Sequence, residues 1–314
     1  MIMVLVPILL ICVGLAIVVL SADEAIKRLL NLARYLRLSE FVVSFVIAGI
    51  VTVLPELSIG VLAAIEGTSS LGFGIILGSN VADLTLVIGT VLLFGGEMKL
   101  DKKTIKNIRL SFLAVIFPVV LLIDGEISRI DGGILVLAFM LYLFVMLRSK
   151  RDQKLFWGKK PKLRLLFEIL ILVACLLILF IGGTLVTDNS QSLSSLLGLP
   201  LFVVGAVVAV GTCLPELVFA IRSCKKHHCE LGLGNILGNV LADSMLTIGI
   251  IALIQPIRPQ FPVPPLLTGT FMVVCTAVVY ILSKDGVLDK RDGILLVAIY
   301  AAFVVMQGTF GIFI

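Results

Sequence analysis

The chain has 314 residues, of which 60% are hydrophobic and 14% are charged, and its mean hydropathy is +1.19. A soluble domain requires far more polar surface, so this composition excludes a soluble globular protein and predicts a chain embedded in lipid. The net charge of +5 does not indicate nucleic-acid binding, because the basic residues fall in the connections between apolar runs.

A helix that spans a bilayer needs about 20 apolar residues. The first apolar run has no cleavage site before Asp23, which predicts a retained helix and no signal peptide. The apolar runs lie at residues 2–21, 42–65, 71–95, 110–123, 130–148, 165–187, 201–221, 231–254, 263–283 and 293–314. The sequence therefore predicts an all-α membrane protein with ten transmembrane helices.

The basic residues predict the orientation of these helices. Of the 25 Lys and Arg, 23 lie in every second connection, at 22–41, 96–109, 148–164, 222–230 and 284–291. The other two, Arg129 and Arg258, lie in connections on the opposite side. Because cytoplasmic connections are enriched in Lys and Arg, both termini are predicted to lie outside.

An internal repeat relates the two halves of the chain. Residues 52–56 read TVLPE and residues 212–216 read TCLPE, while residues 72–78 read GFGIILG and residues 232–238 read GLGNILG. Asp83 matches Asp243 at the same offset of 160 residues. A single offset kept through glycines, prolines and acids predicts a duplicated unit.

Each copy of this unit holds five predicted spans, and because five is odd the second copy is inverted in the membrane. The predicted organisation is a first five-helix repeat at 1–147, a basic cytoplasmic linker at 148–164 and a second five-helix repeat at 165–314. The repeated motifs occupy 42–95 and 202–254. Transporters commonly use inverted repeats, with the substrate site at the repeat interface near the midplane.

Acids within predicted spans are candidates for function, because a carboxylate inside a membrane is costly. In the first repeat these acids are Glu56 and Asp83. Their counterparts are Glu216 and Asp243. Capping or packing does not account for four acids at matched places deep in apolar runs. Each has a polar companion four residues earlier, on the same helix face: Thr52, Ser79, Thr212 and Asn239.

Pro55 and Pro215 stand directly before the two glutamates. A proline inside a helix removes a donor and clashes with the preceding turn, so local unwinding is expected to free the carbonyls of Thr52 and Thr212. Carboxylates with free carbonyls, and without His or thiolate, suit a hard cation such as Ca²⁺. Mg²⁺ would require a tighter octahedral geometry.

Residues 224–229 read CKKHHC, which has the residue types of a metal motif. No second ligand cluster would complete a zinc site, so a basic connection with two incidental thiols is the preferred interpretation.

In its paired motifs the chain resembles the cation/calcium exchanger superfamily, and most closely the prokaryotic sodium/calcium exchanger branch. Each inverted repeat of that family has a GTSLPE-like stretch and a second stretch that begins GS or GN and ends in Asp or Asn. Here these are residues 51–56 (VTVLPE) with 78–83 (GSNVAD), and 211–216 (GTCLPE) with 238–243 (GNVLAD). The resemblance covers nearly the whole chain and implies transport by alternating access.

The resemblance also implies the ligands of each ion. Ca²⁺ would be held by Glu56, Glu216 and the carbonyls of Thr52 and Thr212. Asp83 and Asp243 would complete the group of acids at this metal site. The competing ions would use Asp83, Asp243, Ser79 and Asn239.

The motifs depart from the family in ways that bear on the counter-ion. The Ser that follows each Thr in the family is Val53 in one half and Cys213 in the other, which depletes the neutral oxygens that Na⁺ requires. Four neighbouring acids cannot all remain ionised without cations, which favours protons. The GNAxE stretch of the proton-coupled branch is absent. The counter-ion therefore stays open between Na⁺ and H⁺.

The sequence thus predicts a secondary active antiporter of the cell membrane, and not an enzyme, that exchanges Ca²⁺ for Na⁺ or H⁺. Its expected partners are inorganic cations and the bilayer, with no cofactor, no nucleic acid and no obligatory protein partner. A passive cation channel is the alternative, which proline-broken inverted repeats disfavour. An intramembrane aspartyl protease would need a Gly-x-Gly-Asp stretch, which neither Asp83 nor Asp243 has.

Overall fold

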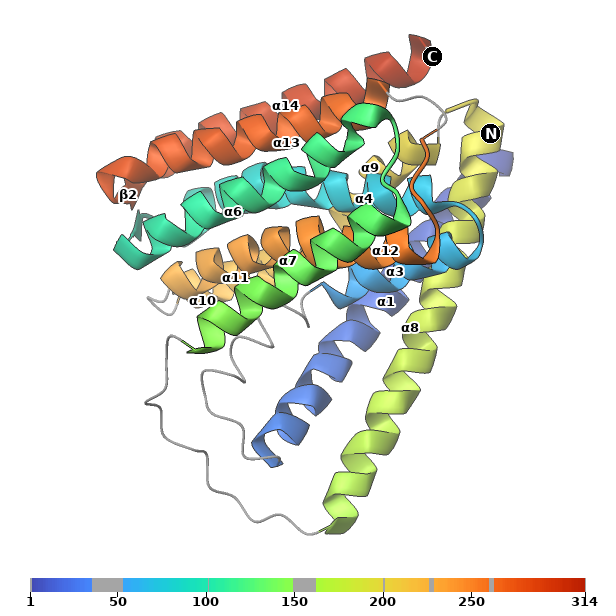
Figure 1. The fold of residues 1–314 in the computed structure, drawn as a ribbon, viewed down its shortest axis with the longest axis horizontal. Helices are drawn as coiled ribbons and strands as arrows, with labels where there is room; N and C mark the ends of the chain where they lie inside the picture. The colour runs from blue at the N-terminus through green and yellow to red at the C-terminus, as the bar shows by residue number, and fades with distance from the viewer. Residues whose placement is uncertain are drawn as a thin grey trace.

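The computed structural model describes residues 2–35, 53–100, 102–148, 162–199, 201–225, 229–259 and 263–313. Within these ranges the chain folds into a bundle of helices with one very small sheet (Figure 1). Six of its helical stretches are long and apolar enough to cross a membrane. Two shorter apolar helices cover Leu54–Ile65 and Phe112–Asp124.

The elements of the two halves correspond in order. The first half contains α1 (Ile2–Tyr35), α3 (Leu54–Ile65), α4 (Ser69–Ala82), the π-helix η2 (Asp83–Val87), α5 (Ile88–Gly95), β1 (Met98–Lys99), α6 (Lys102–Leu121), the 3₁₀ helix η3 (Leu122–Asp124) and α7 (Arg129–Arg148). The second half contains α8 (Lys162–Leu197), α9 (Leu201–Thr212), α10 (Leu214–Lys225), α11 (Cys229–Ala242), the π-helix η4 (Asp243–Thr247), α12 (Ile248–Ile254), α13 (Val263–Leu282), the 3₁₀ helix η5 (Ser283–Asp285), β2 (Val287–Leu288) and α14 (Lys290–Phe313).

The ten predicted spans are confirmed, since each apolar run coincides with a helix or an interrupted helix in this order. The run at 42–65 is described only from residue 53, and most of the linker predicted at 148–164 lies outside the described residues. The sidedness of the termini and the domain boundaries remain predictions.

Irregular turns recur at matched positions of the two halves. The π-helices η2 and η4 begin at Asp83 and Asp243, and the 3₁₀ helices η3 and η5 end one residue before Gly125 and Gly286. Both glycines have a positive φ, 95° and 77°, which a residue with a side chain rarely adopts. The repeat therefore extends to local backbone geometry.

The two halves interlock. The last helix of each half packs on the third span of the other half, α14 on α5 and α7 on α12. Strand β1 pairs antiparallel with β2, and at the matching position of the other connections Ile127 forms a bridge with Ile257. Helices α1 and α8 pack mainly against each other, inclined to the rest of the bundle (Figure 1).

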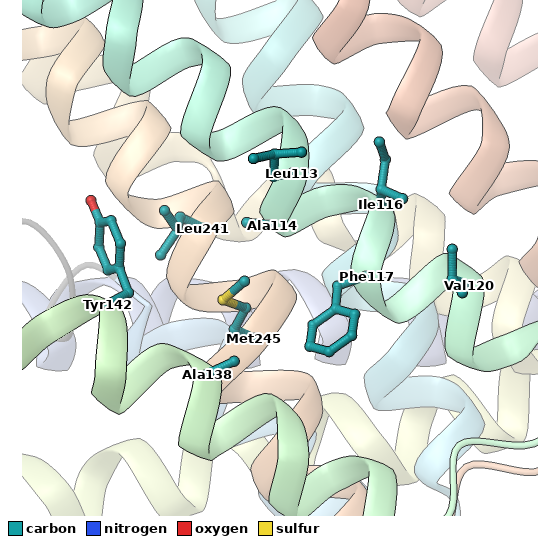
Figure 2. Close-up of a pocket in the computed structure, with 9 residues that line it drawn as sticks. All are labelled: Leu113, Ala114, Ile116, Phe117, Val120, Ala138, Tyr142, Leu241 and Met245. Carbon is teal, nitrogen blue, oxygen red and sulfur yellow. The ribbon is translucent and has the colours of Figure 1, made fainter. Parts of the chain in front are cut away.

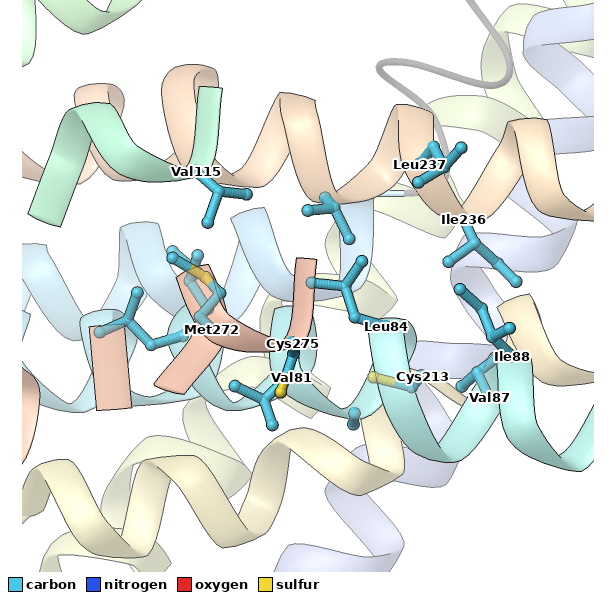
Figure 3. Close-up of a cluster of buried hydrophobic side chains, with 14 of the residues drawn as sticks. Val81, Leu84, Val87, Ile88, Val115, Cys213, Ile236, Leu237, Met272 and Cys275 are labelled. Carbon is cyan, nitrogen blue, oxygen red and sulfur yellow. The ribbon is translucent and has the colours of Figure 1, made fainter. Parts of the chain in front are cut away.

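The π-helix η2 lies inside the protein. Its residues Leu84 and Val87 belong to the largest buried cluster, together with Ile236 of α11 and Met272 of α13 (Figure 3). Apolar side chains from the second half thus surround the segment that begins at Asp83. An acid at the start of this segment faces protein and not lipid.

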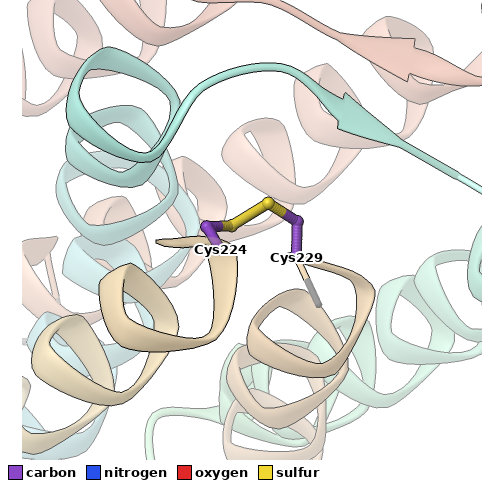
Figure 4. Close-up of a disulfide and its surroundings, with 2 residues drawn as sticks. All are labelled: Cys224 and Cys229. Atoms are coloured by element: carbon purple, nitrogen blue, oxygen red, sulfur yellow. A yellow bond between two sulfur atoms is a disulfide. The ribbon is translucent and has the colours of Figure 1, made fainter. Parts of the chain in front are cut away.

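One sequence interpretation is wrong. Cys224 and Cys229 are not incidental thiols, because they form a disulfide that joins the end of α10 to the start of α11 (Figure 4). Residues 226–228 between them lie outside the described residues. The bond holds the two ends together, so α10 and α11 are linked covalently as well as by packing.

Candidate cation site

The two glutamates stand in the first turns of equivalent helices. Glu56 lies in the first turn of α3, and Glu216 lies in the first turn of α10, after a break at Cys213 that separates α10 from α9. Pro215 has no N–H, so the Gly211 carbonyl has no helical donor. The positive end of a helix dipole favours a carboxylate at such a position.

Both glutamate side chains are buried without a partner. Glu56 is 0% exposed and Glu216 is 1% exposed. Neither carboxylate oxygen of either residue accepts a hydrogen bond in the described structure. A buried carboxylate without compensation is strongly unfavourable, so these four oxygens are expected to be satisfied by a bound cation or a proton.

The two aspartates are held by hydrogen bonds that cross between the repeats. Asn239 donates from Nδ2 to Asp83 Oδ2 at 3.0 Å, and Ser79 donates from Oγ to Asp243 Oδ2 at 3.4 Å. The sequence placed each of these companions on the helix face of the acid that follows it. The structure instead pairs each companion with the acid of the opposite repeat. Oδ1 of both aspartates remains without a partner.

The four acids form one electrostatic group. Each carboxylate interacts with the others, and none of them forms an ion pair with a basic side chain of the described ranges. Among the described residues, no three His, Cys, Asp or Glu side chains already surround one point at metal-binding distance. The four carboxylates repel one another while no cation is bound.

The threonine positions are only partly described. Thr212 is buried at the end of α9, where its hydroxyl donates to the Ala209 carbonyl at 2.8 Å. Thr52 lies outside the described residues. The roles of Thr52 and Thr212 in binding a cation through their carbonyls stay predictions.

Sequence comparison of the repeats missed three buried polar residues in or against η4, the segment that begins at Asp243. Asn80 donates from Nδ2 to Ser244 Oγ at 3.1 Å, and the Thr247 hydroxyl lies beside the Asp243 carboxylate. At the matching positions the other half has Val240, Leu84 and Val87. A search for matched polar pairs cannot find residues that occur on one side only.

A pocket of about 260 Å³ lies nearby but is not the site. Apolar side chains of α6 and α7, with Leu241 and Met245 from the segment that contains Asp243, line it (Figure 2). The only polar group among the labelled side chains is the Tyr142 hydroxyl. These walls offer no set of ligands for an ion.

Interlocked inverted repeats around a buried, uncompensated group of carboxylates define a secondary cation transporter. The chain belongs to the sodium/calcium exchanger protein family, whose profile matches residues 6–148 and 167–309. The chain is thus a multi-pass protein of the cell membrane and an antiporter, and not an enzyme.

Individual relatives are similar over much of the chain. The sodium/calcium exchanger MaX1 of Methanosarcina acetivorans is 26% identical over 97% of this chain and 99% of that protein. The inner membrane protein YrbG of Escherichia coli is 28% identical over 79% of each chain. The solved structure of the sodium-calcium exchanger NCX_Mj soaked with Na⁺ and Sr²⁺ superposes with a TM-score of 0.67 and 26% identity, over 96% of this chain and 99% of that one.

Proposed function

We propose that this protein exchanges Ca²⁺ for Na⁺ or H⁺ across the cell membrane by alternating access. The observation that carries the proposal is the pair of matched glutamates, Glu56 and Glu216, whose four oxygens are buried without a partner. Ca²⁺ binds six to eight oxygens and favours carboxylates among them. Asp83, Asp243 and the carbonyls of Thr52 and Thr212 supply further ligands in this proposal.

The same group of acids accounts for exchange. Ca²⁺ and the counter-ion each neutralise the negative charge of the same carboxylates. The two ions therefore compete for one site. With no ion bound, four acids repel one another inside the membrane, which makes the bare site costly. An ion-bound site can therefore move between the two sides more readily than a bare one, which couples the two fluxes.

The names of the relatives support this choice of ion. MaX1 is named a sodium/calcium exchanger, and the similar NCX_Mj structures were soaked with Na⁺ together with Ca²⁺ or Sr²⁺. The chain shares the family and the fold with these proteins.

A flux measurement tests the proposal against a channel. The purified protein is reconstituted in liposomes, and ⁴⁵Ca²⁺ uptake is measured with an outward Na⁺ gradient, with a pH gradient, and with neither. We expect uptake only where a counter-ion gradient is present. Equal uptake in all three cases, at a membrane potential clamped to zero, would identify a channel.

A further inference from the structure

The disulfide between Cys224 and Cys229 breaks the symmetry of the two repeats (Figure 4). At the same offset of 160 residues the first repeat has Ala64 and Ser69, which form no covalent cross-link. Ser69 instead donates hydrogen bonds to the other half from its N–H and its hydroxyl. The disulfide lies at the ends of the basic connection 222–230, which is predicted to face the cytosol, while its counterpart is predicted to face outward.

The predicted location gives this disulfide a chemical meaning. Dithiol reductants keep thiols reduced in the cytosol, so a disulfide there is most often transient and responds to the redox state. Cys224 is buried against Gly95 at the end of α5, where a β-carbon on the glycine would lie 2.9 Å from the Cys224 β-carbon. Cys229, the first residue of α11, is half-buried. A reductant therefore reaches Cys229 more readily than Cys224.

Helix α10 connects this disulfide to the candidate cation site. Glu216 lies in its first turn and Cys224 in its last turn, about 12 Å further along the helix axis. The first end of α10 adjoins the break after α9, where the Cys213 N–H reaches the Ala209 carbonyl at 3.4 Å and Pro215 has no N–H to donate. The other end is held by the disulfide. The helix that carries Glu216 thus has a weak joint at one end and a covalent anchor at the other.

We propose that the disulfide between Cys224 and Cys229 is a thiol–disulfide exchange site for a cytosolic dithiol reductant. Its reduction releases the inner end of α10, and the oxidised protein transports more slowly because Glu216 is carried by an anchored helix. The inference rests on the proposed function for the transport rate alone. The exchange reaction and the release of α10 do not depend on which ion the protein carries.

The reaction consumes one dithiol and leaves one disulfide on the partner. A thiolate of the reductant attacks Cys229 Sγ, and the S–S bond breaks with its electron pair on Cys224 Sγ, which takes up a proton. The second thiol of the reductant then loses its proton and displaces Cys229 from the mixed disulfide. The protein gains two electrons and two protons in total. In the reverse direction the Cys229 thiolate attacks the oxidised partner, and the positive end of the α11 dipole favours an anion at this position.

The accessible side of the disulfide is tested first. Sealed membrane vesicles of each orientation are treated with reduced thioredoxin, a dithiol protein that does not cross membranes. Free thiols are then counted by coupling to polyethylene glycol maleimide in detergent. The chain has six cysteines, of which four are free while the disulfide is intact. We expect six labels when the inner face is outward and four labels in the opposite orientation.

The effect of reduction is then measured on the purified protein. We expect the initial rate of ⁴⁵Ca²⁺ uptake along a counter-ion gradient to rise about fivefold, a change of about 1 kcal/mol in the barrier. Hydrogen–deuterium exchange of the α10 backbone should also accelerate, because its inner end is no longer held. Cys224→Ser and Cys229→Ser should match the reduced wild type without any reductant. Cys12→Ser is the control, because Cys12 is an exposed free cysteine of α1, and it should keep the wild-type response.

The outcomes separate this inference from the proposed function. Faster deuterium exchange of α10 on reduction, without ⁴⁵Ca²⁺ uptake in either state, would refute the proposed function and leave the exchange site in place. The inference is overturned if thioredoxin does not reduce the folded protein, or reduces it only from the outer face. It is equally overturned if reduction leaves deuterium exchange of α10 unchanged, or if a transporting protein has the same rate in both states. A response of Cys224→Ser or Cys229→Ser to the reductant would also contradict it.

Discussion

Gly89 of α5 lies against the backbone of Gly293 of α14: a β-carbon on Gly89 would come within 2.9 Å of the Gly293 carbonyl oxygen. The matching pair in the other half has the same relationship, since a β-carbon on Gly132 of α7 would lie 2.7 Å from the Gly249 carbonyl oxygen of α12. Small residues allow helices to approach this closely in membranes. The last helix of each repeat therefore packs closely against the span of the other repeat that contains the π-helix.

Two neighbouring glycines of α7 provide a test of this packing. Gly132→Ala should destabilise the protein by about 1–3 kcal/mol, because its methyl group would press on the backbone of α12. Gly133→Ala should be neutral or stabilising by up to about 1 kcal/mol, since a β-carbon there meets nothing within 4 Å and alanine favours a helix. Thermal unfolding in detergent would measure both. Equal effects of the two substitutions would contradict the packing argument.

Neutralising either glutamate should abolish Ca²⁺ transport. Glu56→Gln and Glu216→Gln each remove one charge and one bidentate ligand from the proposed site, while the neutral amide costs less in the membrane than an unpaired carboxylate. We therefore expect normal expression and folding with no ⁴⁵Ca²⁺ uptake. Glu66→Gln is the control, because Glu66 is an exposed residue at the end of α3. If Glu56→Gln or Glu216→Gln takes up Ca²⁺ at the wild-type rate, the substituted residue does not belong to the proposed site.

The constant offset between the repeats predicted the spans and their order, because hydropathy and repeated motifs are local properties of the sequence. The offset also predicted that Glu56 and Glu216 belong to one group of acids. It did not predict that Ser79 and Asn239 bind the acid of the opposite repeat, because helix spacing describes only a residue's own helix. The π-helices at Asp83 and Asp243 depend on packing that no motif encodes. Thr247 was missed because its counterpart is Val87, so nothing in the repeat marked it.

The ends of α1 and α8 are joined by an ion pair that should contribute to stability. Arg28 lies 3.2 Å from the largely buried Glu168 of α8, which also accepts a hydrogen bond from Asn31 at 3.1 Å. Arg28→Met leaves Glu168 without its charged partner, so we expect a larger loss of unfolding free energy than Lys27→Met produces. Lys27→Met, on an exposed face of the same helix, should cost about 0–1 kcal/mol.

The effect of Arg28→Met should depend on pH. The hydrogen bond from Arg28 holds the pKa of Glu24 below its usual value of 4.5. A carboxyl whose pKa is lower in the folded state stabilises the protein above the unfolded pKa, and that contribution is lost as the pH falls through the folded pKa. The difference between wild type and Arg28→Met should therefore shrink in acid. A difference that grows below pH 4.5 would contradict this assignment.

The predicted sidedness can be tested with a membrane-impermeant thiol reagent. In a cysteine-free background, a cysteine at Glu126 should react in intact cells, and a cysteine at Lys99 should react only after permeabilisation. Glu126 lies in an outer connection and Lys99 in an inner one, according to the distribution of Lys and Arg. The reverse pattern would place both termini on the cytoplasmic side.

Acid should inhibit Ca²⁺ transport, and Asp83 should contribute to this sensitivity. Protons and Ca²⁺ compete for the same carboxylates, so the apparent affinity for Ca²⁺ should fall by up to about tenfold per pH unit for each proton displaced. In Asp83→Asn the amide oxygen can still accept the hydrogen bond from Asn239, so the fold around η2 should persist. With one fewer acid to protonate, this variant should transport Ca²⁺ with a weaker dependence on pH. Half-saturating Ca²⁺ measured over a series of pH values in both proteins tests the expectation. An unchanged pH dependence would show that Asp83 does not exchange protons for Ca²⁺, and a complete loss of transport would show that its charge is required to bind Ca²⁺.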